Sequence, residues 1–132
     1  MNHAEAVILC RYVRAVCPQQ AIDSFTPDAW ADLLANIRMT DARDAVRAIA
    51  SRQPFVAPAE IITEVRKLRN DRIRRHPEPV PPPNLTPLES KRWLIEARRQ
   101  IGDGATLDDN TRGELHDRDL SQLAIGHTIP AA

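Results

Sequence analysis

The sequence predicts an all-α protein with a compact helical head at its N-terminal end. Three observations support this prediction. In several stretches the apolar residues recur every three or four positions, which is the spacing of one helix face. Threonine, proline and acidic residues stand where these stretches begin, as they do in the first turns of helices. Aromatic residues make up only 4% of the 132 residues, so the core must consist mainly of alanine, valine, isoleucine and leucine.

The first expected helix runs from His3 to Cys17 and ends before Pro18. Its apolar stripe has the spacing 3-1-3-3-1 and consists of Ala6, Leu9, Cys10, Val13, Val16 and Cys17. On a helix the Cα atoms of Cys10 and Cys17 lie roughly 10 Å apart. A disulfide needs a separation below about 7 Å. We therefore expect two buried thiols rather than a bridge.

Two shorter helices are expected next. Thr26 is the predicted cap of the second, with Pro27 at its first helical position. Its inward face is formed by Trp30, Leu33, Leu34 and Ile37. Thr40 is the predicted cap of the third helix, with Asp41 in the first turn. The stripe of that helix consists of Ala42, Ala45, Val46 and Ile49.

A loop bracketed by Pro54 and Pro58 separates the third helix from the fourth. Phe55 and Val56 are too apolar for a free surface loop, and we expect both to plug into the core. The fourth helix begins at Pro58. Its expected buried face consists of Ile61, Ile62, Val65 and Leu68.

Beyond Leu68 the fourth helix loses its apolar pattern and is expected to project from the head. Six basic residues occur within ten positions: Arg66, Lys67, Arg69, Arg72, Arg74 and Arg75. At about 100° per residue they surround more than one face. Such a segment is either a solvated helix end that complements the helix dipole or a surface for anions. The anions would be phosphates of a nucleic acid, such as single-stranded DNA, or acidic groups of a protein.

Four segments are predicted. They are the head with its basic final helix at 1–76, a proline-rich linker at 77–86, an amphipathic helix at 87–101 and an acidic, flexible tail at 102–132. Thr86 and Glu89 form the pattern of a capping box at the start of the third segment. One short helix has no core of its own. We expect it to dock on the head, on a second copy or on another protein, with Trp93 and Leu94 as its apolar anchors.

The charges are unevenly distributed although they sum to zero. Residues 58–76 hold six basic and three acidic residues, whereas residues 102–132 hold two basic and six acidic ones. This asymmetry indicates a charged partner, or one end of the chain masking the other. Within the tail, His116 stands among Glu114, Asp117 and Asp119, which we interpret as part of a solvated acidic segment rather than as a metal or acid–base site.

The sequence carries no recognisable catalytic motif. All four glycines lie after residue 101, so the chain has no glycine-rich phosphate loop. No serine, cysteine or histidine stands in a nucleophile context. We therefore expect a non-catalytic protein without a cofactor, a bound metal or a small-molecule substrate. No apolar run approaches the roughly 20 residues of a membrane span, and we expect a cytoplasmic protein that has no membrane partner.

The head resembles the small phage replication proteins that load or inhibit the replicative helicase. The resemblance covers about residues 3–70 and rests on three features of the sequence. They are Trp30/Leu33/Leu34 in the second helix, Asp41/Ala42/Ala45/Val46 in the third, and the loop Pro54/Phe55/Pro58. It implies a DNA replication adaptor that contacts a replicative helicase hexamer and lacks the ATPase module of larger bacterial loaders.

Two other functions fit the same head. The second and third helices, joined by a short turn, could form a helix-turn-helix of a small DNA-binding regulator. Against this, acidic residues stand at the start of the third helix, where base contacts are made. The chain could also inhibit another host protein, which the sequence does not separate from the adaptor.

Overall fold

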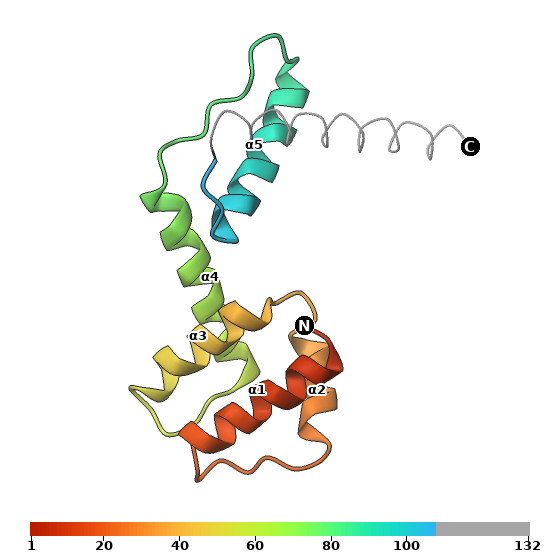
Figure 1. The fold of residues 1–132 in the computed structure, drawn as a ribbon, viewed down its shortest axis with the longest axis vertical. Helices are drawn as coiled ribbons and strands as arrows, with labels where there is room; N and C mark the ends of the chain where they lie inside the picture. Colours follow the sequence, from red (N-terminus) through yellow and green to blue (C-terminus); the bar gives the residue numbers. More distant parts are fainter. Residues whose placement is uncertain (108–132) are drawn as a thin grey trace, which may run out of the picture. The chain divides into compact units, whose positions relative to one another are not determined.

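A computed structural model describes residues 1–107, which contain five helices and no strand (Figure 1). The helices are α1 (His3–Val16), α2 (Thr26–Leu33), α3 (Met39–Ala50), α4 (Pro58–Arg75) and α5 (Pro87–Gly102). The all-α prediction is confirmed, and the predicted tail lies outside the described residues from Asp108 onward. No helix in the described part is long and apolar enough to cross a bilayer.

The chain divides into two units. The first comprises Met1–Leu68 and the second begins at Arg69. The sequence places the boundary after His76, whereas the last two turns of α4 belong to the second unit. The reason is that this end of α4 packs against residues that follow it in the chain.

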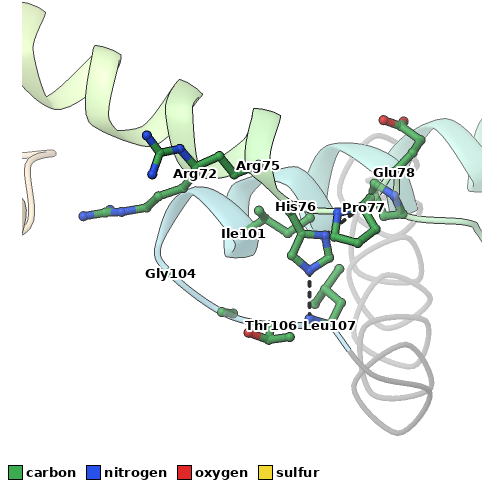
Figure 2. A pocket seen from close by; sticks show the side chains of 11 residues that line it. Arg72, Arg75, His76, Pro77, Glu78, Ile101, Gly104, Thr106 and Leu107 are labelled. Carbon is green, nitrogen blue, oxygen red and sulfur yellow. Dashed lines mark hydrogen bonds between the residues drawn. The ribbon is translucent and has the colours of Figure 1, made fainter.

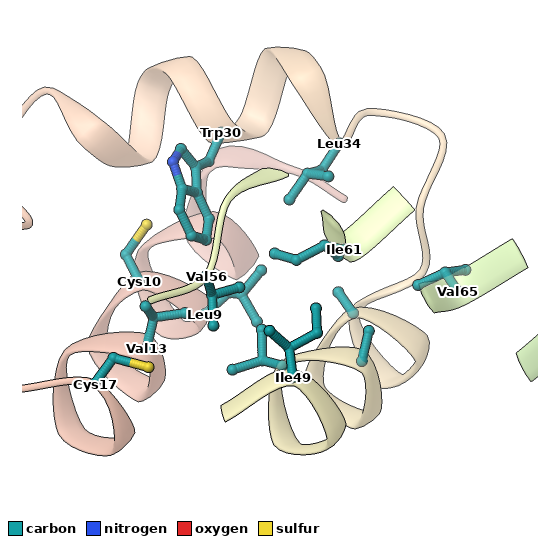
Figure 3. Close-up of a cluster of buried hydrophobic side chains, with 13 residues drawn as sticks. Leu9, Cys10, Val13, Cys17, Trp30, Leu34, Ile49, Val56, Ile61 and Val65 are labelled. Atoms are coloured by element: carbon teal, nitrogen blue, oxygen red, sulfur yellow. The ribbon is translucent and has the colours of Figure 1, made fainter. Parts of the chain in front are cut away.

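The core of the first unit gathers the predicted stripes of α1, α3 and the start of α4 around Trp30 (Figure 3). Its buried side chains are Leu9, Cys10, Val13, Cys17, Trp30, Leu34, Ala42, Ala45, Val46, Ile49, Val56, Ile61 and Val65. Fully burying a side chain the size of valine or leucine contributes about 1.5–3 kcal/mol. These few contacts therefore supply the main stabilisation of a unit that holds little aromatic surface.

Local polar contacts fix where α1 and α2 begin. A capping box opens α1: the Glu5 amide donates to Asn2 Oδ1 at 2.8 Å, and the Asn2 amide donates to Glu5 Oε1 at 3.0 Å. Sequence analysis missed this box. Before α2, the carboxylate of Asp23 accepts the amides of Phe25 and Thr26, and these hydrogen bonds, that of Phe25 first, lower its pKa. Thr26 is consequently the first helical residue rather than the cap.

Three predicted core residues of the first unit are exposed, the first of them Val16 at the end of α1. Leu33 is 58% exposed, because α2 ends there and the turn that follows buries Leu34 instead. Phe55 is 52% exposed, so its predicted role as a core plug is wrong, whereas Val56 is buried as expected. Gln20 accounts for this difference. Its side chain accepts the amide of Val56 and donates to the carbonyl of Val56, both at 2.7 Å, which holds Val56 against the core and leaves Phe55 outside.

The two loop residues should respond differently to truncation. Phe55→Ala should change the free energy of unfolding by less than about 0.5 kcal/mol, as is usual for exposed positions. Val56→Ala removes two buried methyl groups and should cost about 2 kcal/mol. Denaturant melts of both variants measure this, and a larger loss for Phe55→Ala than for Val56→Ala would contradict the structure.

Both cysteines are free thiols in the core of the first unit. Burial raises the pKa of Cys10 to about 11 and also raises the pKa of Cys17. Only the thiolate attacks alkylating reagents, and a raised pKa means less thiolate at a given pH. The absence of a bridge between them agrees with their expected separation along the helix.

Native protein should therefore react very slowly with a thiol reagent at mildly alkaline pH, and both thiols should react at once in denaturant. Alkylation followed by peptide mass spectrometry distinguishes the two positions. Reaction of Cys10 in native protein at the rate found in denaturant would show that it is not buried.

Candidate binding surface

The second unit has a small core of its own. Trp93, Ala97 and Ile101 of α5 are buried together with Leu107, and Ile73, Leu85 and Leu94 pack against them. The sequence predicted that α5 would dock on the head, on a second copy or on another protein. It packs on the last two turns of α4, which the sequence assigned to the head, and on the residues before α5 and those after it. Because Ile73 stands alone among arginines, the sequence gave little indication that this end of α4 packs against α5.

The N-terminal end of α5 is fixed as predicted. The hydroxyl of Thr86 accepts the Glu89 amide at 3.2 Å, and the Glu89 carboxylate accepts the Thr86 amide at 2.9 Å. The preceding proline-rich residues contain no helix. Pro79 is nevertheless buried and Leu85 contacts the core, so this segment is part of the second unit. Asn84 turns the chain with a φ of 69°, in the left-handed region that asparagine tolerates.

Two of the predicted partner-binding arginines hold the other end of α5. Arg69 pairs with the carboxylate of Asp103 and donates to the Arg99 carbonyl at 3.2 Å. Arg72 donates to the Gly102 carbonyl at 2.8 Å. The last carbonyls of a helix lack partners within it and form the negative end of its dipole. We call Arg69 and Arg72 the arginine clamp, because Arg72 satisfies the Gly102 carbonyl and Arg69 adds a second donor to the Arg99 carbonyl, which also accepts the Asp103 amide.

The clamp lies close against the backbone of α5. A Cβ atom at Gly102 would lie 3.0 Å from Arg69 Nη2, so the glycine allows the guanidinium to approach. The side chains of Arg69 and Asp103 are 27% and 26% exposed. Their ion pair is thus better shielded from water than an ordinary surface pair. A charge reversal at Arg72 would disturb the second unit itself, and would not test binding alone.

The other predicted residues lie in different surroundings. Arg74 and Arg75 are exposed, and both pair with Asp71 on the same helix, at 3.5 and 3.1 Å. Arg66 and Lys67 are exposed in the first unit. Of the six predicted basic residues, Arg69 and Arg72 are the two that bind the end of α5.

The two predicted apolar anchors belong to the core of the second unit. Trp93 is fully buried and Leu94 is partly buried. A partner could reach Trp93 only if this core opened. An apolar contact made by the intact unit must therefore use more exposed side chains, such as Val80 before α5 or Leu88 and Ile95 on α5.

Such side chains stand on the opposite side of α5. Six exposed residues recur there with the spacing 3-1-3-3-1: Leu88, Lys91, Arg92, Ile95, Arg98 and Arg99. We call this set the outer face. It combines two aliphatic residues, 57% and 59% exposed, with four basic ones and contains no acidic residue. Sequence analysis missed it because the apolar stripe on the buried side dominates the helix.

The cations of the outer face differ in their pairing. Arg98 pairs with Glu78 at 3.0 Å. Arg99 pairs with Glu96 at 2.6 Å, and this hydrogen bond is the main reason why its pKa is raised. Lys91 and Arg92 form no ion pair or hydrogen bond with any side chain in residues 1–107. Their charges are therefore available to an anionic partner.

The described part of the second unit carries an excess of positive charge. Residues 69–107 hold eight basic and five acidic residues, a net charge of +3. Residues 1–68 hold eight of each sign. Among the described residues, the excess positive charge thus lies in the second unit, where the outer face is exposed.

A cavity of about 560 Å³ also opens in the second unit (Figure 2). Arg72, Arg75, Ile101 and Leu107 line it together with His76. His76 Nε2 accepts the Leu107 amide at 3.3 Å, while Nδ1 lies 2.7 Å from the Pro77 carbonyl. His76 therefore ties the residues after α5 to the end of α4.

No group of residues suited to hold a metal ion occurs in the described part of the chain. A scan of protein-family models finds no match, and neither the curated proteins nor the solved structures include one that is similar to this chain. Function must therefore be inferred from the side chains. Their arrangement suits recognition of an anionic surface that also has apolar pockets.

We expect the arginine clamp to stabilise the second unit. Replacing both Arg69 and Arg72 by methionine keeps the apolar stems but removes the donors, and should cost the second unit about 1–3 kcal/mol. The two tryptophans lie in different cores, Trp30 in the first unit and Trp93 in the second. Fluorine NMR of fluorotryptophan-labelled protein can follow the unfolding of each unit separately.

The matched control is the pair Arg74→Met and Arg75→Met, which removes the same charge from exposed positions and should change stability by less than about 0.5 kcal/mol. The Trp93 signal should melt earlier only in the clamp variant, with Trp30 unchanged. Equal effects of the two double variants would contradict the clamp.

Proposed function

We propose that this protein is a non-catalytic DNA replication adaptor that binds a replicative helicase hexamer through the outer face of α5. The observation that carries the proposal is the position of Lys91 and Arg92. They have no partner among the described side chains and lie between the exposed Leu88 and Ile95. A helix face of this composition gains from a partner that neutralises charge and covers apolar surface together.

An acidic protein surface satisfies both requirements better than a nucleic acid does. Phosphates would neutralise Lys91 and Arg92 but would leave Leu88 and Ile95 without apolar neighbours. Single-stranded nucleic acids are usually held by stacking on aromatic rings, and the outer face has none. Aliphatic anchors surrounded by basic residues are instead a common composition of protein interfaces with electrostatic steering.

The choice of a helicase as the partner comes from the resemblance of the head to phage helicase-loading and helicase-inhibiting proteins. The two-unit layout supports this choice, since it separates a helical head from a second element with its own exposed face. Contact through α4 would use the exposed Arg66, Lys67, Arg74 and Arg75, because the clamp arginines are occupied within the second unit.

Charge reversal at the outer face should weaken binding to a purified replicative helicase hexamer. The variant Lys91→Glu/Arg92→Glu should lose tenfold or more in affinity at about 50 mM salt, and much less at about 500 mM, because salt screens exposed charges. The control Arg11→Glu/Arg14→Glu makes the same charge change on exposed positions of α1 and should bind like the parent.

Removing the aliphatic side chains of the outer face should weaken binding in a way that does not depend on salt. Leu88→Ser/Ile95→Ser should weaken binding at both salt concentrations to a similar extent, since apolar burial is little affected by screening. Light scattering after size exclusion and calorimetric titration measure the complex. Labelled duplex and single-stranded DNA should show at most weak, sequence-independent binding. Parent-like helicase binding by both variants, or tight sequence-specific duplex binding by the parent, would refute the proposal.

A further inference from the structure

The exposed side of α2 combines apolar and acidic residues. Trp30 and Leu34 point into the core of the first unit (Figure 3), so the opposite side of α2 is left to solvent. Five exposed residues recur there with the spacing 3-1-3-1: Phe25, Asp28, Ala29, Asp32 and Leu33. Phe25 and Leu33 are 77% and 58% exposed, and none of the five residues is basic. We call this set the acidic face.

The two apolar residues of the acidic face stand at the two ends of α2. Phe25 directly precedes the helix and has helical backbone angles, with φ −92° and ψ −20°. The carboxylate of Asp23 accepts its amide at 2.9 Å and so fixes the backbone at this point. Leu33 is the last residue of α2. Because the backbone that carries both side chains is held in place, docking through them loses little backbone entropy.

The two carboxylates of the acidic face are accessible to a partner. Asp28 pairs with His3 Nδ1 at 2.8 Å, but the two side chains are 68% and 63% exposed, and such exposed pairs contribute little to stability. Asp32 forms no ion pair or hydrogen bond with any side chain in the described part of the chain. The acidic face therefore presents negative charge between two apolar side chains. It fits a surface that presents positive charge in the same arrangement.

The outer face of α5 has this arrangement. Lys91 and Arg92 stand there between the exposed aliphatic residues Leu88 and Ile95. At a rise of 1.5 Å per residue, the two aliphatic residues lie about 10 Å apart along α5, and the two apolar residues of the acidic face lie about 12 Å apart along α2. Two helices with these faces can therefore lie side by side with the charged pairs opposite each other and the apolar residues in contact at both ends.

We infer that the acidic face of α2 docks on the outer face of α5 in a second copy of the chain. Of the eight large hydrophobic side chains that are exposed in residues 1–107, four belong to these two faces, so one contact covers half of them. The same contact neutralises two acidic and two basic residues. A nucleic acid or an anionic membrane is a poor partner for the acidic face, since both require basic residues.

Each copy carries both faces, so the contact can form twice within one dimer, once in each direction. One short helix against another buries less area than the roughly 1,200 Å² of a stable interface, so the complex should be weak and should dissociate on dilution. Self-association also covers Lys91 and Arg92, which then cannot contact an acidic partner at the same time. Only this competition rests on the proposed function, because self-association is measured without a helicase.

Charge exchange between the two faces tests the inference in the full chain. Sedimentation equilibrium at low salt should show that the mass of the parent rises with concentration. Asp28→Lys/Asp32→Lys makes both faces basic and Lys91→Glu/Arg92→Glu makes both acidic, so each variant alone should associate at least tenfold more weakly than the parent. An equimolar mixture of the two variants restores opposite charges across the contact and should associate like the parent. Circular dichroism melts confirm that each variant folds.

Two controls make the same charge changes at other exposed positions. Asp44→Lys on α3 is compared with Asp32→Lys alone. Arg11→Glu/Arg14→Glu on α1 lies near the exposed Ile8 and tests whether a different basic surface is used. Both controls should associate like the parent.

Four results would overturn the inference. The parent could remain a monomer at all concentrations, as it would if the acidic face were free or bound only within its own chain. Either double variant of the two faces could associate like the parent. The mixture could fail to associate, or Arg11→Glu/Arg14→Glu could weaken association as much as Lys91→Glu/Arg92→Glu does.

Discussion

The second unit depends on the contact between two arginines of α4 and the carboxyl end of α5. A helix of 16 residues is only marginally stable alone, and its packed side offers few buried side chains. Arg69 and Arg72 add charge-assisted hydrogen bonds to the carbonyls and the carboxylate at its end. The capping box at Thr86 satisfies the opposite end. With both ends held, the rotation of α5 is fixed, and this decides which residues form the core and which form the outer face.

The clamp changes how the basic end of α4 is interpreted. A run of arginines resembles an anion-binding surface, yet its two most protected members serve the chain's own backbone. Exposed positive charge without an ion pair among the described residues then lies at Lys91 and Arg92 of α5 and at Arg66 and Lys67 of α4.

Helical periodicity predicted most of the fold but only part of the site. The stripes of α1 and α3 and the capping box of α5 follow from local spacing, which is why they were predictable. Phe55 and Trp93 were not, because their burial depends on distant residues: Gln20 fixes the loop beside Phe55, and Ile73 and Leu107 cover Trp93. Apolar character alone could not show that the first is exposed and the second buried. The outer face could have been found by applying the same spacing rule to both sides of α5.

The most direct measurement of the central claim is oxidative footprinting of the free chain with hydroxyl radicals, read residue by residue in α5. If the clamp and the small core hold α5 as described, Trp93 should be oxidised far more slowly in native than in denatured protein. Leu88 and Ile95 should be modified at similar rates in both. Rapid oxidation of Trp93 in the native chain, with Leu88 and Ile95 protected, would mean that the opposite side of α5 is the exposed one and would contradict the account.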